Sequence, residues 1–149
     1  MSEENNLPTP SVVEETLSAQ RDHWKLICER ALSISHRDLP PEAPRRILLF
    51  GVGSSHYAAK LTAFAMIRDH FRQRVPVVSC ASQEIGVEVI PQKGDFAIAF
   101  SHRGRTEITR EAMEICSRAG AFVIQVSGEN AAEAPATRLL ITTTPQEKV

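Results

Sequence analysis

The chain has 149 residues, of which 42% are hydrophobic and 23% are charged, and its formal net charge is −1. This length suits one globular domain with a real core, and the balanced charge gives no reason to expect nucleic acid or an anionic membrane as a partner. No apolar run approaches the roughly 18 residues of a membrane span, and the polar N-terminus does not resemble a signal peptide. We therefore expect a cytoplasmic protein in which any anion site is local.

Cysteine and histidine patterns point to no disulfide framework and no metal site. The three cysteines Cys28, Cys80 and Cys116 are odd in number and form no CxxC pair. We expect them to be reduced and mostly buried. The five histidines show no metal-ligand spacing, so the sequence predicts neither a metal nor another cofactor.

The N-terminal part of the chain predicts a tail followed by one long helix. Residues 1–10 are polar and contain two prolines, which is typical of a flexible tail. Ser11 and Glu14 fit a capping box, and apolar residues then recur at helical spacing as far as Ile34. The segment 11–40 is therefore predicted to be an N-terminal helix. It could cover a sheet face or an oligomer interface, and the pattern does not choose between them.

Two strand, polar loop and helix units follow within residues 45–149. The apolar run 47–50 leads into a polar loop and a helix that is apolar almost all round, which predicts deep packing of that helix. The run 95–100 leads into a second polar loop and a helix over 107–119, with Gly120 as its C-cap. Further strands are predicted at 75–79, 121–126 and 138–142, and a short helix or turn at 81–86. Pro76 belongs at a strand start or on a sheet edge.

Alternation of strands and helices predicts the fold class. Five strands with intervening helices favour an α/β fold, in which a five-stranded parallel sheet lies between two helical layers as a three-layer αβα sandwich. In such sheets, ligands bind beyond the carboxyl ends of the strands. Both polar loops lie at those ends, so they would face one crevice if their strands are neighbours.

The loop from Ser101 to Thr106 has the chemistry of a phosphate site. It offers two hydroxyls, two guanidinium groups, an imidazole and a glycine, and it opens a helix. The amides at a helix start lack intrahelical partners and sit at the positive end of the helix dipole, which suits an anion. Arg103 and Arg105 could grip phosphate with two hydrogen bonds each. The alternative is a simple helix cap flanked by two solvated arginines.

The earlier loop, Gly51 to His56, offers backbone and hydroxyl groups. Its glycines allow close backbone approach, and Ser54 and Ser55 could cap the helix or bond a ligand oxygen. A dinucleotide site is disfavoured, because the third glycine is replaced by His56 and the next strand ends without an acidic residue. Neither loop has the Gly-Lys-Ser/Thr of a P-loop, and the GxSxG elbow of hydrolases is absent.

With these loops in view, the chain resembles the SIS (sugar isomerase) domain family over roughly residues 11–149. Gly51-Val52-Gly53-Ser54-Ser55 is similar to the family's G-x-G-[ST]-S loop, and Ser101-His102-Arg103-Gly104-Arg105-Thr106 to its phosphate loop, S-x-S-G-x-T. Thr144-Pro145-Gln146-Glu147 is similar to the glutamate-bearing segment after the last strand in the isomerase domain of glucosamine-6-phosphate synthase. The helix that precedes the sheet also fits that branch of the family. Arg103 departs from the family, which usually has a second serine there.

The resemblance implies a phosphosugar-binding domain of an amino-sugar or ketose/aldose phosphate isomerase or deglycase. The implied partners are a sugar phosphate, such as fructose 6-phosphate or glucosamine 6-phosphate, and further copies of the chain as a homo-oligomer. The implied alternatives are a non-catalytic sugar-phosphate sensor and an inactive fragment of an enzyme with two such domains. The catalytic base region of the family has no clear counterpart here, which leaves Glu84, Glu147 and His102 as weak candidates. The implied substrate-binding residues are Gly53, Ser54, Ser55, Ser101, His102, Arg103, Gly104 and Thr106.

Overall fold

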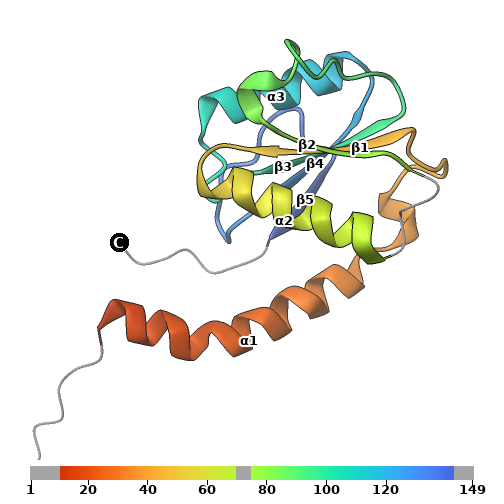
Figure 1. The fold of residues 1–149 in the computed structure, drawn as a ribbon. Coiled ribbons are helices and arrows are strands. Elements are labelled where there is room, and N and C mark those ends of the chain that lie inside the picture. The colour runs from red at the N-terminus through yellow and green to blue at the C-terminus, as the bar shows by residue number, and fades with distance from the viewer. Residues whose placement is uncertain (1–10, 70–74, 143–149) are drawn as a thin grey trace, which may run out of the picture.

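In the computed structural model of the protein, which describes residues 11–69 and 75–142, the sheet is parallel and has the strand order β2-β1-β3-β4-β5. Two helical layers enclose the sheet (Figure 1), which confirms the predicted α/β sandwich. The strands are β1 (Arg46–Gly51), β2 (Val77–Ala81), β3 (Asp95–Phe100), β4 (Phe122–Ser127) and β5 (Leu139–Thr142). The helices are α1 (Val12–Ser33), α2 (Ser54–Asp69) and α3 (Glu107–Arg118), with short 3-10 turns η1 (His36–Asp38) and η2 (Ser82–Glu84).

Local sequence signals set the ends of these elements. Ser11 caps α1 with the predicted capping box, in which the Ser11 hydroxyl accepts from the Glu14 amide and the Glu14 carboxylate accepts from the Ser11 amide. These hydrogen bonds from Ser11 lower the pKa of Glu14. Pro76 precedes β2, which is an edge strand. This position suits proline, because proline has no amide hydrogen to donate to a neighbouring strand. Gly120 follows α3 with a φ of 82°, the left-handed conformation of a C-cap.

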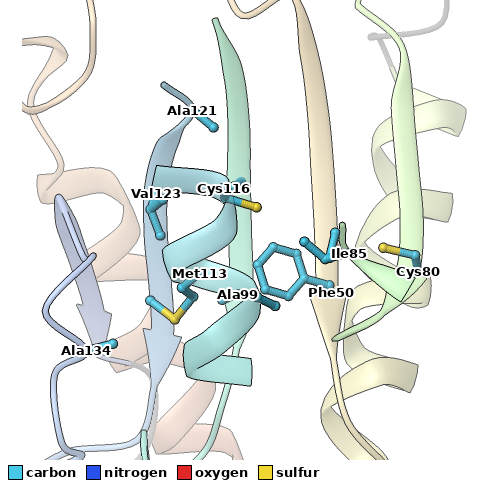
Figure 2. Packing of buried hydrophobic residues seen from close by; sticks show 11 residues of the cluster. Phe50, Cys80, Ile85, Ala99, Met113, Cys116, Ala121, Val123 and Ala134 are labelled. Carbon is cyan, nitrogen blue, oxygen red and sulfur yellow. The ribbon is translucent and has the colours of Figure 1, made fainter. Parts of the chain in front are cut away.

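Two hydrophobic clusters lie on opposite faces of the sheet because side chains alternate along each strand. On one face, Phe50, Ala97 and Ala99 pack against Met113 and Cys116 of α3. Figure 2 shows the ring of Phe50 with Ile85 on one side and these α3 residues on the other. On the opposite face, Ile47, Leu49 and Ile98 of the sheet pack against Ala59 and Ala63 of α2.

The prediction that the whole of α2 packs deeply is wrong for this chain alone. Ala59 and Ala63 are buried against the sheet, but Tyr57, Leu61 and Phe64 are 67%, 71% and 65% exposed. In one copy of the chain, only one side of this apolar helix has a partner. Within residues 11–69 and 75–142, no helix combines the length and apolar character that crossing a bilayer requires.

The three cysteines separate into two environments, and the prediction of mostly buried thiols holds for two of them. Cys28 is exposed on α1, whereas Cys80 and Cys116 are buried. Burial, with a smaller contribution from the nearby Glu84 carboxylate, raises the pKa of Cys80 to about 11. Burial, with smaller contributions from Cys80 and Asp95, raises the pKa of Cys116 to about 12. Both thiols therefore stay protonated at neutral pH and are chemically inert while the core is closed.

Candidate functional site

The two polar loops follow neighbouring strands, and from these loops the chain continues to opposite faces of the sheet. β1 and β3 are neighbouring parallel strands, with Phe50 opposite Ala99 near their carboxyl ends. The loop after β1 opens α2 on one face, while the loop after β3 opens α3 on the other (Figure 1). This is the topological switch point at which open parallel sheets bind ligands. The loops 51–56 and 101–106 therefore lie at one edge of the sheet, on neighbouring strands.

Each glycine of the first loop has its own geometric reason. A Cβ on Gly51 would lie 2.8 Å from the backbone carbon of Ser55, so only glycine lets the first turn of α2 approach β1 this closely. Gly53 has a φ of 58°, the left-handed conformation that turns the chain into the helix. Ser54 is exposed and Ser55 is half-buried at the helix start. Backbone amides and hydroxyls therefore line this side of the switch point.

His56 at the start of α2 has a structural contact. Its Nδ1 donates to the carbonyl oxygen of Cys80 at 2.9 Å, which links α2 to the end of β2. The ring is half-buried. This bond fixes the tautomer, since Nδ1 carries the proton and leaves Nε2 as the acceptor.

The second loop contains a buried hydroxyl without a partner. Ser101 is 5% exposed, and its Oγ has no hydrogen-bond partner among the described residues. It continues the alternation of Ala97 and Ala99, so it lies on the α3 face of β3. Among the described residues, the Oγ of Ser79 on the edge strand β2 is also buried without a hydrogen-bond partner, although Ser79 as a whole is only half-buried. Ser101 differs because it lies at the foot of a helix N-terminus.

The start of α3 is uncapped by side chains. Thr106 occupies the N-cap position, but its hydroxyl makes no capping hydrogen bond. In the part of the chain that the structure describes, the amides of His102, Arg103 and Arg105 donate to no backbone carbonyl. His102, Arg103, Arg105 and Thr106 are exposed. Free amides, a free hydroxyl and the positive end of the α3 dipole therefore converge here.

Gly104 forces the close contact between this loop and the segment that joins β4 to β5. Its φ is 65°, and a Cβ at this position would lie 1.8 Å from the carbonyl oxygen of Ala132. The amide of Ala132 donates to the carbonyl of Arg103 at 3.1 Å, and the amide of Gly128 to that of His102 at 2.9 Å. The segment 128–137 thus supports the loop 101–106 from behind.

Gln125 organises this support and was missed by the sequence reasoning. It is buried, and its amide nitrogen donates to the Ser127 hydroxyl and to the carbonyl of Ala132, both at 2.9 Å. Its amide oxygen accepts from the amide of Ala134 and the hydroxyl of Thr137, also at 2.9 Å. The Ser127 hydroxyl in turn donates to the carbonyl of Ser101 at 2.7 Å. The available signal was a glutamine inside an apolar strand, since buried polar groups are hydrogen-bonded.

The weak catalytic candidates lie in different settings. The Glu84 carboxylate accepts from the amide of Ala81 at 3.2 Å, and the Glu84 carbonyl closes the turn that follows. His102 is exposed, with its ring close enough to Gly128 that a Cβ there would lie 3.1 Å from its Cε1. Glu147 lies outside the described residues, as do the tail predicted for 1–10 and the segment Thr144–Glu147. In residues 11–69 and 75–142, no group of three His, Cys, Asp or Glu side chains could hold a metal ion.

A cavity of about 680 Å³ opens at the other edge of the sheet, near the amino ends of β3 and β4. Asp95 lies in its wall, fully buried, and accepts from Arg45 Nη1 at 3.0 Å and from Arg46 Nε at 3.2 Å. Burial acts to raise the pKa of Asp95, but hydrogen bonds from Arg46, the Gln92 amide and Arg45 outweigh it and lower that pKa. This ion cluster joins β3 to the residues at the start of β1 and is separate from the polar loops.

Comparisons with known proteins show the fold. A protein of Clostridium difficile 630 assigned as a phosphosugar isomerase superposes with a TM-score of 0.66 at 14% identity, over 83% of this chain and 34% of that one. NanR of Vibrio vulnificus, complexed with ManNAc-6P, gives 0.60 at 14% identity, over 87% and 51%. A protein of E. coli CFT073 in complex with a sugar phosphate gives 0.61 at 14% identity, over 94% and 77%.

These structures share the sandwich described above, and two of them hold sugar phosphates. The chain spans about a third of the Clostridium protein and about half of NanR. Searches against protein-family models and curated protein sequences find no match. The fold is therefore that of phosphosugar isomerases and of NanR, at sequence identities at which the fold alone is shared.

Proposed function

We propose that this domain binds a sugar phosphate in the crevice beyond the carboxyl ends of β1 and β3, with the phosphate at the start of α3. The observation that carries the proposal is the buried, unpartnered Ser101 hydroxyl beneath an uncapped helix N-terminus. A buried donor left unpaired costs about 1–3 kcal/mol, and a phosphate oxygen at this position would satisfy it. The same oxygens would accept from the free loop amides and from the Thr106 hydroxyl.

The remaining contacts follow from the same placement. Gly53, Ser54 and Ser55 would present backbone and hydroxyl groups to the sugar, because they open the helix on the other side of the crevice. Arg103 is exposed at the loop tip, so its guanidinium can reach a bound phosphate from the solvent side. His102 would lie beside the bound phosphate. Gly104 would shape the loop rather than touch the sugar.

For the reaction, the resemblance favours an amino-sugar or ketose/aldose phosphate isomerase or deglycase. Within the family, it favours the branch that contains the isomerase domain of glucosamine-6-phosphate synthase. Such chemistry needs a base that moves a proton between two sugar carbons. Among the described residues, the Glu84 carboxylate is already engaged with the Ala81 amide. We therefore propose that the base comes from outside the described part, from Glu147 or from another domain or copy.

A sugar-phosphate sensor without catalysis is the second candidate. It is favoured by the engaged state of Glu84 and by the likeness to NanR, which was solved with ManNAc-6P. A coupled assay of fructose 6-phosphate isomerisation separates the candidates. Turnover that is abolished by Ser101→Ala identifies the enzyme, whereas binding without turnover identifies the sensor.

Binding is tested by isothermal titration calorimetry with fructose 6-phosphate, glucosamine 6-phosphate and fructose. Both phosphates are expected to bind, and free fructose is not, because the proposed site holds the phosphate. Ser101→Ala and Thr106→Ala should each weaken binding at least about tenfold, since a hydrogen bond to a charged group contributes about 1.5–3 kcal/mol.

Thr62→Ala is the matched control, because the Thr62 hydroxyl bonds back to the carbonyl of Ala58 within α2. Its affinity should equal that of the original protein. Equal affinity for fructose and fructose 6-phosphate, or unchanged affinity in both loop variants, would contradict a phosphate site in this loop. Circular dichroism confirms that each variant is folded.

A further inference from the structure

The cavity of about 680 Å³ lies at the edge of the sheet opposite to the polar loops. Its wall is made of residues that directly precede β1, β3 and β5, of the first residues of β3 and β4, and of the end of α3. Small-molecule sites usually have volumes of about 300–1,000 Å³, so the cavity is large enough for a ligand. The proposed sugar-phosphate site uses none of its residues.

Backbone hydrogen bonds hold the wall of this cavity together. The amide of Arg45 donates to the carbonyl of Gly94 at 2.8 Å, and the amide of Gly94 donates to the carbonyl of Gly120 at 3.4 Å. The amide of Arg138 donates to the carbonyl of Val123 at 2.9 Å. The connections that lead into the neighbouring strands are therefore fastened to one another, and the cavity is part of the folded sandwich.

Arg45 is a cation of the wall that the protein orients. Its Nη1 donates to the buried carboxylate of Asp95 at 3.0 Å, while its side chain is 49% exposed. Among the described residues, its Nε and Nη2 have no hydrogen-bond partner. The same carboxylate also accepts from Arg46 and from the Gln92 amide. Two cations therefore share one anion, and Arg45 offers its remaining donors to the cavity.

Other charged groups face the same cavity. Lys93 and Arg138 are exposed, and their side chains have no partner in the described part of the chain. Glu42 is an exposed carboxylate, and Gly120 brings the negative end of the α3 dipole into the wall, where a Cβ on Gly120 would lie 3.3 Å from Lys93 Cβ. With the buried ion cluster included, four cations oppose two carboxylates and this helix end. An excess of positive charge remains.

One part of the wall is aromatic. Phe96 and Phe122 lie opposite each other on β3 and β4, with ring centroids 5.5 Å apart and an angle of 41° between the rings. Both are half-buried and line the cavity. We call these two residues the aromatic pair. A third ring would bury apolar surface against them and gain favourable ring contacts.

We propose that this cavity is a second ligand site and that it binds a small aromatic monocarboxylate. Arg45 would hold the carboxylate through its free donors, and the aromatic pair would receive the ring. Lys93 and Arg138 would attract the anion at the mouth. A single negative charge matches the small surplus of the wall, because a second one would be repelled by Glu42 and by the end of α3. The site does not depend on sugar-phosphate binding.

Nitrogen–proton NMR spectra of the full chain, titrated with 3-phenylpropionate, test the site. The amide signals of Gly94, Gly120 and Phe122 should shift, and those of the loop 101–106 and of α2 should not. The amide 3-phenylpropanamide has the same ring without the charge, and propionate has the charge without the ring. Each should bind at least about tenfold more weakly than 3-phenylpropionate, because each lacks one of the two contacts.

Charge variants separate a built site from general attraction of anions. Arg45→Gln should weaken binding of 3-phenylpropionate at least about tenfold, because it removes the oriented donors. The double variant Lys93→Gln/Arg138→Gln should weaken it about two- to tenfold, as expected of two exposed cations. Glu42→Gln should strengthen binding, because it removes a repelling charge.

The matched control is the double variant Lys60→Gln/Arg118→Gln. It removes the same two charges from exposed positions on α2 and α3 that do not line the cavity. Its affinity for 3-phenylpropionate should equal that of the original protein. Circular dichroism checks the fold of every variant, and the Lys93→Gln/Arg138→Gln variant decides if Arg45→Gln does not fold, since it breaks no side-chain contact of the described chain.

The proposal is overturned if 3-phenylpropionate shifts no amide at this edge of the sheet, or if its shifts centre on the exposed side of α2. Equal affinity for the acid and its amide would likewise overturn it, as would equal weakening by the control and by Lys93→Gln/Arg138→Gln. A separate titration with fructose 6-phosphate keeps the two proposals apart. Shifts in the loop 101–106 would support the proposed function whatever happens at the second site.

Discussion

Two glycines with nearly the same φ angle have different surroundings in the candidate site. Gly53 and Gly104 have φ values of 58° and 65°. A Cβ on Gly53 would meet nothing within 4 Å, whereas one on Gly104 would lie 1.8 Å from the carbonyl oxygen of Ala132. Gly53 is therefore needed only for its dihedral angles. Gly104 is needed in addition because the β4–β5 segment touches the loop at that atom.

This difference predicts unequal losses of stability for the two alanine variants. Gly53→Ala should lower the free energy of unfolding by about 1–2 kcal/mol, the cost of a left-handed residue with a side chain. Gly104→Ala should lower it by more than about 3 kcal/mol, because the backbone of Ala132 must also move. Urea denaturation followed by circular dichroism measures both. Equal losses would show that the backbone of Ala132 moves away from the added methyl group at no cost in stability.

At the scale of elements, β3 connects the candidate site to an ion cluster at its other end. Its carboxyl end leads into the loop 101–106, and its first residue, Asp95, is buried and held by Arg45 and Arg46 next to β1. These contacts help fix β1 and β3 side by side. The alignment of the two strands decides how the loops 51–56 and 101–106 face each other, so the cluster supports the site from the far edge of the sheet.

The cluster predicts a pH-dependent contribution to stability. The pKa of Asp95 is lowered in the folded state, so its contribution is present above the unfolded pKa, near 3.8, and is lost as pH falls through the lower folded value. Asp95→Asn should cost about 3 kcal/mol at pH 7, as breaking a buried ion pair does. This cost should shrink below about pH 4, because the protonated acid resembles asparagine. Urea denaturation of the original protein and of Asp95→Asn, at pH 7 and below about pH 4, measures this cost. A cost that does not change with pH would contradict the assignment of Asp95 as the titrating group.

At the scale of the whole molecule, the sheet divides the interior into two clusters, and α1 stands outside both. Cys80 and Cys116 lie in the cluster beneath α3, together with Phe50 and Met113 (Figure 2). Their raised pKa values result mainly from burial in this layer. Access to these thiols therefore reports on the opening of the sandwich as a whole.

Thiol labelling of the Cys28→Ser variant checks this organisation. At pH 8 and without denaturant, neither remaining thiol should react with a thiol-specific chromogenic reagent, because both are buried and protonated. Both thiols should become reactive together as urea unfolds the chain. The urea midpoint of their reactivity should equal the unfolding midpoint measured by circular dichroism. Rapid reaction of Cys116 in the native state would mean that α3 opens separately from the rest of the sandwich.

The sequence alone determined the fold class, the order of the elements along the chain and the two polar loops. Period-two and period-3.6 patterns, the capping box at Ser11 and the glycine at 120 are local signals, and local signals can be read from one chain. The role of Gln125 could be suspected from a polar residue in an apolar strand, but not its four partners. Three of those partners belong to a segment that follows the strand and folds back over it.

Only the tertiary structure decided which surfaces meet. Burial of the Ser101 hydroxyl, the contact of Gly104 with Ala132 and the engagement of Glu84 by the Ala81 amide all depend on how the chain packs. The exposed side of α2 is the clearest case, because its composition predicted deep packing. Hydrophobic periodicity records that a face avoids water, and it does not record whether the same chain or another copy covers that face.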